Sequence, residues 1–252
     1  MTEALAGRGF DAIVDLLGRL ATDASLAVMQ AAVNTGIPRA IPSFFGPRLD
    51  RHDVTSLPFL SVKVPIRKDI EEKAAKGQIT YTGINTGVFL DWSLDYNAFV
   101  NLSGKGKTPL YDGGDIPISA SAHDDIGRAI AAVLSKPEET ANKAVSVHSV
   151  VMTQNQVLGY ARKAAPGVEF AVEPCDTKAL VDSAWEEYNA GSRDFETMRK
   201  FAASGWFGMG NGLFERTDNE FLGIELWSDE RLREEIARRL GEKPPAASEG
   251  AQ

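Results

Sequence analysis

The chain of 252 residues is 43% hydrophobic and 25% charged, a balance that excludes wholesale disorder and a fibrous protein. Its net charge of −8 argues against a nucleic-acid partner, because phosphate binding needs clustered Lys and Arg. The single cysteine, Cys175, excludes an internal disulfide framework and a multi-thiolate metal site.

The sequence also lacks the marks of membrane and secreted proteins. No apolar stretch approaches the roughly 20 residues that span a bilayer. Residues 1–10 have neither the basic flank nor the apolar run of a secretory signal. We therefore expect a cytoplasmic protein without a membrane partner. Residues 243–252, which contain paired prolines and several small residues, are expected to form a disordered tail.

The first half of the chain alternates short apolar runs with helical periodicity. Strands are expected at residues 11–18, 39–43 and 78–85, and helices at residues 24–35 and 64–76. A glycine follows each helix and provides a stop signal. Strand, helix and strand in this order call for right-handed parallel crossovers, so the pattern predicts an α/β fold with a parallel sheet.

The second half has a looser alternation and shorter elements. Residues 109–119 are interpreted as a hairpin around the turn Asp112-Gly-Gly-Asp. A helix at residues 124–134 is expected to be capped by Ser121 or Asp124, and a strand follows at residues 144–148. Further helices are predicted at residues 153–164, 177–189, 194–204 and 228–240, the last with Ser228 as its cap and Arg231 in the turn that follows.

The common catalytic and nucleotide-binding motifs are absent from the sequence. There is no Gly-x-Gly-x-x-Gly turn, Walker loop, His-Glu-x-x-His or Gly-x-Ser-x-Gly. The glycine cluster at residues 208–212 is not followed by a helix that could bind a phosphate. His52, His123 and His148 are scattered without a ligand spacing, so no metal site is expected.

Three segments carry a combined resemblance to one known family. Residues 40–46, Ala-Ile-Pro-Ser-Phe-Phe-Gly, are similar to the signature Arg-Phe-Leu-Pro-Ser-Glu-Phe-Gly, and residues 63–67 resemble a Lys-x-x-x-Arg helix start. Residues 79–89 resemble the strand that follows in the same family. In order, spacing and residue type, the chain resembles the isoflavone-reductase-like (NmrA-like) group of atypical short-chain dehydrogenases.

This resemblance implies a Rossmann-like NADPH-dependent oxidoreductase that acts on a small aromatic or secondary-metabolite substrate. Residues 1–105 would form a partial NAD(P)-binding region, and residues 106–242 a smaller, helix-rich substrate-binding region. The family's glycine-rich first turn has no counterpart before Gly18. We therefore expect an N-terminally truncated sheet, weak NADPH binding, and an unpaired apolar edge at residues 12–17.

The resemblance places a catalytic lysine at Lys63. A lysine at the start of a helix meets the positive end of the helix dipole, which favours loss of its proton and suits an acid or base near neutral pH. We expect it to project into a cleft bounded by Ser43 and Gly87. Residues expected to bind the cofactor at the carboxyl ends of parallel strands are Leu17, Gly18, Pro42, Ser43, Phe44, Asn85, Thr86, Gly87 and Phe89.

Two other interpretations of the function stay open. The family also contains non-catalytic regulators that sense the dinucleotide and bind a protein partner, and an inactive truncated product is a third alternative. The sequence leaves open the identity of the small-molecule substrate and whether the chain forms a homo-oligomer.

Overall fold

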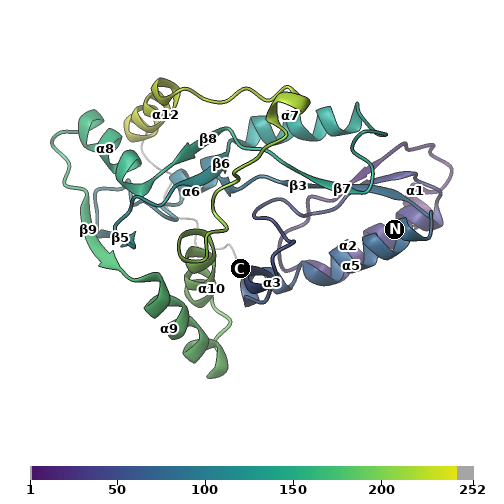
Figure 1. Cartoon of the computed structure of the whole chain (residues 1–252), viewed down its shortest axis with the longest axis horizontal. Helices are drawn as coiled ribbons and strands as arrows, with labels where there is room; N and C mark the ends of the chain where they lie inside the picture. The colour runs from purple at the N-terminus through teal and green to yellow at the C-terminus, as the bar shows by residue number, and fades with distance from the viewer. Residues whose placement is uncertain (1, 243–252) are drawn as a thin grey trace.

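The computed structural model describes residues 2–242 and contains a four-stranded parallel sheet of order β1-β2-β3-β7 (Figure 1). Its strands are β1 (Ile13–Val14), β2 (Arg39–Ile41), β3 (Thr80–Asn85) and β7 (Lys143–Ser146). Each neighbouring pair runs parallel. The predicted Rossmann-like parallel sheet is therefore confirmed, although its strands are shorter than the sequence pattern indicates.

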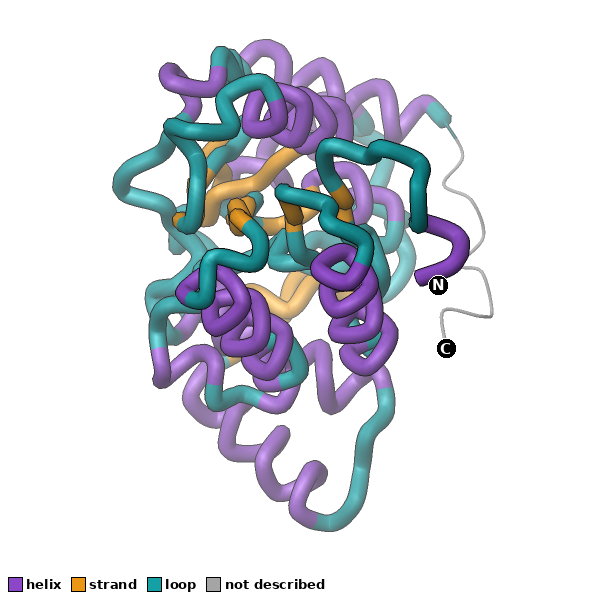
Figure 2. Tube along the Cα trace, turned by 90° about the vertical axis from the view of Figure 1, so that its right-hand side faces the viewer, coloured by secondary structure: helices purple, strands orange, loops and turns teal. Residues whose placement is uncertain are grey.

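Helices cover both faces of this sheet (Figure 2). On one face, α2 (Thr22–Asn34) packs beside α5 (Val64–Ala75), and the short α1 (Thr2–Leu5) packs on α2. On the other face lies α7 (His123–Leu134). The consecutive residues Ala40 and Ile41 of β2 enter different buried clusters, because successive side chains of a strand point to opposite faces.

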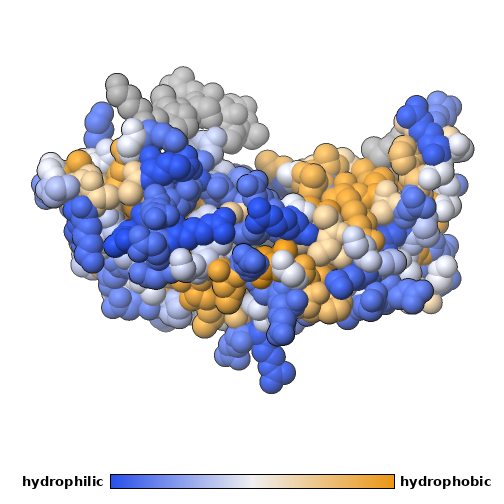
Figure 3. Space-filling view, turned by 90° about the horizontal axis from the view of Figure 1, so that it is seen from above, coloured by the Kyte–Doolittle hydropathy of each residue, from blue (hydrophilic) through white to orange (hydrophobic). Residues whose placement is uncertain are grey.

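The β1 end of the sheet carries exposed apolar side chains. Among the described strands, β1 pairs only with β2. Just after it, Leu16 and Leu20 are 69% and 73% exposed. Seen from above, the molecule shows apolar side chains gathered between hydrophilic ones (Figure 3). The apolar strand edge expected at residues 12–17 thus has its counterpart in the described fold.

Two smaller sheets continue the fold beyond β3. In the first, β4 (Val88–Phe89) runs parallel to β6 (Ile118–Ser121), which pairs antiparallel with β8 (Val150–Met152). In the second, β5 (Lys107–Tyr111) pairs parallel with β9 (Ala171–Cys175).

The hairpin predicted at residues 109–119 is wrong, because its two halves belong to different sheets. The turn itself exists, since Asp112 and the two glycines after it have positive φ. However, Asp112 Oδ1 accepts a hydrogen bond of 2.9 Å from the backbone N–H of Thr177, and β5 pairs with the distant β9. Long-range pairing has overridden the local turn signal.

The remaining helices agree with the predicted ranges to within one or two residues where a helix was predicted. They are α3 (His52–Thr55), α4 (Pro58–Ser61), α6 (Leu90–Asp95), α8 (Gln154–Ala164), α9 (Thr177–Asn189), α10 (Phe195–Ala203), the π-helical turn η1 (Ser204–Gly208), α11 (Asn219–Leu222) and α12 (Asp229–Gly241). Ser228 caps α12 as predicted and accepts from the N–H of Arg231 at 3.2 Å.

The predicted cap of α7 is wrong. Its N-cap position is Ala122, whose methyl side chain cannot accept a hydrogen bond. Instead Ser149 Oγ accepts from the N–H of Ala122 at 2.8 Å, and a carboxylate oxygen of Asp91 accepts from the N–H of His123 at 2.6 Å. Two residues far away in sequence therefore accept from the first backbone N–H groups of the helix start.

Within residues 2–242, no helix is long and apolar enough to cross a bilayer. The expected tail at residues 243–252 lies outside the described residues.

Candidate functional site

A cavity of about 560 Å³ opens at the carboxyl ends of β1, β2 and β3. Loop residues after these three strands form one wall, and α10 with the turn after it forms the other. Carboxyl ends of parallel strands are where open α/β sheets bind ligands. Most of the lining is apolar, and it includes the aromatic side chains of Phe45, Phe59, Phe89, Trp92, Phe99, Phe195 and Trp206.

Lys63 lies on the cavity wall together with Ser43 and Gly87, so the predicted position of this lysine is confirmed. It occupies the N-cap position of α5, and its Nζ donates a 2.8 Å hydrogen bond to the backbone carbonyl of Phe45. Burial lowers the pKa of Lys63 to about 8, while the charge of Asp15 raises it. Desolvation is thus the main cause of the shift, where the sequence pattern suggested the helix dipole.

Asp15 is a carboxylate beside the site that the sequence analysis did not single out. It is only 2% exposed, and its Oδ1 accepts from the N–H of Leu17 at 2.9 Å. Its other oxygen has no hydrogen-bond partner among the described residues. The signal that could have revealed it is a charged residue inside the apolar run of residues 11–18.

Five of the nine residues expected to bind the cofactor line the cavity. Leu17, Gly18, Ser43, Gly87 and Phe89 lie on its wall. The Oγ of Ser43 also donates to the backbone carbonyl of Leu17 at 2.8 Å, which ties the loop after β2 to the loop after β1. The ends of three separate strands therefore meet at one place, as the parallel arrangement predicts.

The other four expected cofactor residues are not on the wall. Phe44 points to the opposite side from its neighbours Ser43 and Phe45 and packs in the core under the sheet. Asn85 donates to Ser146 Oγ at 3.1 Å, and the carbonyl of Thr86 accepts from the hydroxyl of Ser121 at 2.6 Å.

The fourth of these residues, Pro42, is buried behind the loop. For Pro42 and Phe44 the reason is geometric, because they flank Ser43 and alternate residues of an extended segment face opposite sides. These residues support the wall from behind.

Arg19 is a cation on the wall that the sequence analysis did not single out. Its guanidinium lies 5.5 Å from the centre of the Phe59 ring, and burial lowers the pKa of Arg19. Among residues 2–242 it has no hydrogen bond or ion pair in the structure. A guanidinium in this state can offer its N–H groups to a ligand.

Arg199 of α10 is a second cation on the wall that the sequence analysis did not single out, and all three of its guanidinium nitrogens form hydrogen bonds. Its Nη1 donates to the hydroxyl of Tyr111 at 2.7 Å, while Nε and Nη2 form a fork on the Glu196 carboxylate at 2.8 and 2.5 Å. Burial raises the pKa of Tyr111 to about 12. No local sequence signal links Tyr111 to Arg199, because they come from different elements.

His123, the first residue of α7, also lies on the wall. Its ring stands edge-on to Phe89, with ring centres 5.8 Å apart. Among the described residues no group of three or more His, Cys, Asp or Glu side chains could hold a metal ion.

Comparison with known proteins agrees with this arrangement. Residues 10–189 match the family described as NmrA-like. The chain belongs to the NmrA-like family. It is 28% identical over 196 residues to Oxidoreductase poxI of Penicillium oxalicum, which covers 76% of this chain and 61% of that protein. It is also 28% identical over 189 residues to Oxidoreductase aprR of Aspergillus flavus, covering 74% and 62%. The matches thus span about three fifths of the length of these curated relatives.

Solved structures share the fold of this NmrA-like chain. The binary complex of leucoanthocyanidin reductase with NADPH from Vitis vinifera has a TM-score of 0.75 at 16% identity, over 96% of this chain and 81% of that one. A crystal structure of isoflavone reductase has a TM-score of 0.71 at 18% identity, over 94% and 76%. At these identities the likeness shows the fold.

Proposed function

We propose that this NmrA-like chain acts as an NADPH-dependent oxidoreductase on a small aromatic or secondary-metabolite substrate, with Lys63 handling the proton. The observation that carries the proposal is the half-buried amine of Lys63 on an apolar cavity at the carboxyl edge of a parallel sheet. Solved relatives in complex with NADPH, such as the leucoanthocyanidin reductase of Vitis vinifera, support the choice of cofactor.

The residues present fit the nicotinamide end of such a cofactor. An added Cβ at Gly18 would meet nothing within 4 Å, so the chain leaves open space there. Ser43, Gly87 and Phe89 would flank the ring, and the free N–H groups of Arg19 suit a phosphate oxygen. When bound, NADPH supplies the hydride.

The protein's own part in the chemistry is to move a proton and to exclude water. With a pKa of about 8, Lys63 is mostly protonated at neutral pH and can still release its proton readily. Its hydrogen bond to the Phe45 carbonyl fixes the position of Nζ. The aromatic wall keeps bulk water away from the amine, which strengthens its interaction with a substrate oxygen.

Two measurements test this function. NADPH binding is followed by fluorescence titration, and turnover by the loss of reduced-nicotinamide absorbance with a panel of quinones and aromatic ketones. Lys63→Met should lower kcat by roughly 10² to 10⁴, the usual contribution of a positioned acid or base, with little change in NADPH affinity. Lys76→Met, at the C-cap of α5, is the matched control and should leave kcat unchanged.

The outcomes separate the alternatives. An unchanged kcat in Lys63→Met contradicts the role of the lysine. NADPH binding without turnover of any compound in the panel favours a dinucleotide-sensing regulator. Absence of both binding and turnover contradicts the proposed function.

A further inference from the structure

Apart from two tryptophans, the cavity wall carries five polar side chains, and three of them already have hydrogen-bond partners within the protein. Ser43 donates to Leu17, Lys63 to Phe45, and Arg199 to Tyr111 and Glu196. The other two are Arg19 and His123. Within residues 2–242, the Nε2 atom of His123 has no hydrogen-bond partner. On the described wall, this histidine therefore offers an uncommitted polar atom.

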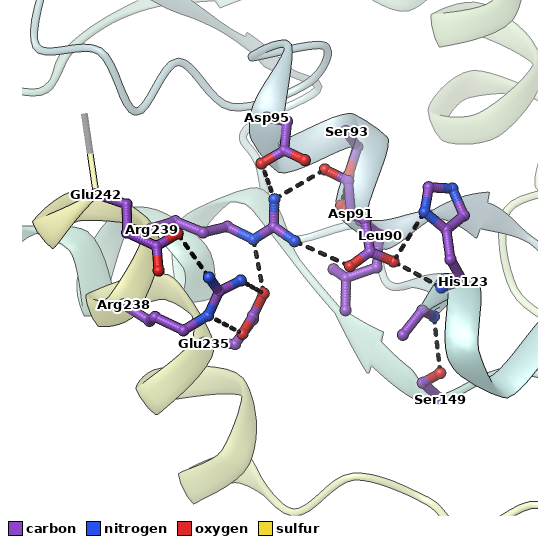
Figure 4. Close-up of polar contacts among 11 residues, drawn as sticks. Leu90, Asp91, Ser93, Asp95, His123, Ser149, Glu235, Arg238, Arg239 and Glu242 are labelled. Atoms are coloured by element: carbon purple, nitrogen blue, oxygen red, sulfur yellow. Dashed lines mark hydrogen bonds and ion pairs between the residues drawn. The ribbon is translucent and has the colours of Figure 1, made fainter. Parts of the chain in front are cut away.

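Asp91 fixes the position of His123 (Figure 4). Asp91 is the second residue of α6, and its Oδ2 accepts from the backbone N–H of His123 at 2.6 Å. The same oxygen lies 3.6 Å from Nδ1 of the His123 ring. Because Ala122 leaves α7 without a local side-chain cap, this carboxylate holds the start of the helix and places a negative charge beside Nδ1 of the ring.

Arg239 of α12 in turn holds Asp91. Its Nη2 binds Asp91 Oδ1 at 2.9 Å, and its Nη1 donates to the Asp91 backbone carbonyl at 3.1 Å. Arg239 also forms ion pairs with Glu235, at 2.7 Å, and with Asp95. Its side chain is only 10% exposed, so solvent weakens these contacts little. Both carboxylate oxygens of Asp91 are thus held in position by the protein before a ligand binds.

The charge of Asp91, 3.6 Å from Nδ1, also influences which nitrogen of the ring carries the proton. A carboxylate beside Nδ1 favours the tautomer with the proton on Nδ1, and it leaves the lone pair on Nε2. The edge-on contact with Phe89, at an interplanar angle of 67°, also restrains the ring. In this tautomer Nε2 accepts a hydrogen bond and therefore matches a ligand that carries a hydroxyl group.

We propose that His123 recognises a hydroxyl group on the ligand of this cavity by accepting a hydrogen bond from it at Nε2. Asp91 and Arg239 act as positioning residues. The inference rests on the proposed function only in taking the cavity as the substrate site. Because the cavity is lined by aromatic side chains, we expect this hydroxyl group to be attached to an aromatic ring system.

Binding of a matched pair of probes tests the role of His123 without any cofactor. Equilibrium dialysis measures the affinity for 2-naphthol and for 2-fluoronaphthalene, which has nearly the same shape but no hydrogen to donate. His123→Phe should weaken binding of 2-naphthol by about threefold to tenfold, the worth of one hydrogen bond, and leave 2-fluoronaphthalene unchanged. His123→Gln, whose amide oxygen can accept, should recover part of the loss.

The contradicting outcomes are distinct. Equal weakening of both probes in His123→Phe, or no weakening of either, overturns the assignment. Failure of both probes to bind the wild-type protein overturns it as well. Melting temperatures of the variants show whether each remains folded. If the probes behave as expected but NADPH neither binds nor is oxidised, the proposed function fails while the hydroxyl contact stands.

The positioning roles have a spectroscopic test. Long-range ¹⁵N–¹H correlation spectra of the neutral His123 ring should show the proton on Nδ1 in the wild-type protein. Asp91→Asn should shift the ring toward a mixture of tautomers, and Arg239→Gln should do so less strongly. Arg233→Gln, on the exposed face of the same helix, is the matched control and should leave the spectrum unchanged. A wild-type ring protonated mainly on Nε2 would overturn the proposal.

Discussion

The two walls of the cavity use their polar side chains differently. The wall formed by the strand ends holds a half-buried amine at Lys63 and a guanidinium at Arg19 that binds no acceptor among the described residues, and behind it Asp15 has a carboxylate oxygen without a partner among them. The wall formed by α10 holds Arg199, whose donors are committed to Glu196 and Tyr111. The difference suggests that the first wall keeps groups ready for chemistry at some cost in stability, while the second is built for packing.

Gly87 of the strand-end wall lies close against β6, and its replacement should have the largest effect on stability. Its φ is +65°, and an added Cβ would lie 2.2 Å from the backbone oxygen of Ser119. Gly87→Ala should lower the free energy of unfolding by about 3 kcal/mol or more. Gly36→Ala is the control, because its φ of +72° is similar but the new Cβ would meet nothing within 4 Å. Equal losses in urea unfolding would show that the close approach to Ser119 does not matter.

On the α10 wall, loss of the arginine should destabilise the fold. Arg199→Met leaves the hydroxyl of the fully buried Tyr111 without its donor, and we expect a loss of about 2 to 3 kcal/mol in the free energy of unfolding. Adding Tyr111→Phe should cost less than the sum of the single changes, because the two residues share one interaction. Additive effects in this double-mutant cycle would contradict the description of this wall.

On the strand-end wall, replacing the cation at Lys63 should instead increase the free energy of unfolding. Burial lowers the pKa of Lys63 to about 8, so between pH 8 and the unfolded value of 10.5 the unfolded chain binds more protons than the folded one. The free energy of unfolding therefore rises as pH increases through this window, and the protein lacks this contribution at neutral pH. Lys63→Met should raise the free energy of unfolding at pH 7 by about 1 to 2 kcal/mol and flatten its rise above pH 8. A less stable variant would contradict the contrast between the walls.

The smallest effect concerns the buried His148, which does not line the cavity. Its Nδ1 is 2.8 Å from the hydroxyl of Ser119, and burial lowers the pKa of His148. The unfolded chain therefore takes up a proton first as pH falls below about 6.5, and stability declines there. His148→Gln should reduce this decline by less than about 1 kcal/mol per pH unit. An unchanged slope in acid unfolding would show that His148 does not contribute to it.

The sequence predicted the strand-end wall better than the opposite one. Strand, helix and strand in close succession define a parallel sheet, and the ends of such strands must meet. This is why Lys63, Ser43 and Gly87 could be placed together before the structure was known. The same pattern does not show which of two adjacent residues faces the cavity. It therefore predicts Phe44 as a cofactor-binding residue, whereas Ser43 and Phe45 line the cavity.

The α10 wall depends on contacts that no local pattern encodes. Tyr111 and Arg199 are 88 positions apart, and the parallel pairing of β5 with β9 replaced the predicted hairpin. Asp91 and His123 are likewise joined by a cap that skips the expected residues Ser121 and Asp124. Periodicity shows that a helix or strand exists, but tertiary packing chooses its partners.

The fourth strand of the main sheet sets an order for its assembly. β1, β2 and β3 can pair once residue 85 has emerged from the ribosome, whereas β7 contributes residues 143–146 to the far side of β3. Until then Ile84 of β3 lacks Val145, its neighbour in the ladder. Closing so long a loop slows folding, and an edge left open in the meantime invites contact with other chains. During translation, the nascent sheet is therefore most exposed to aggregation between the emergence of β3 and that of β7.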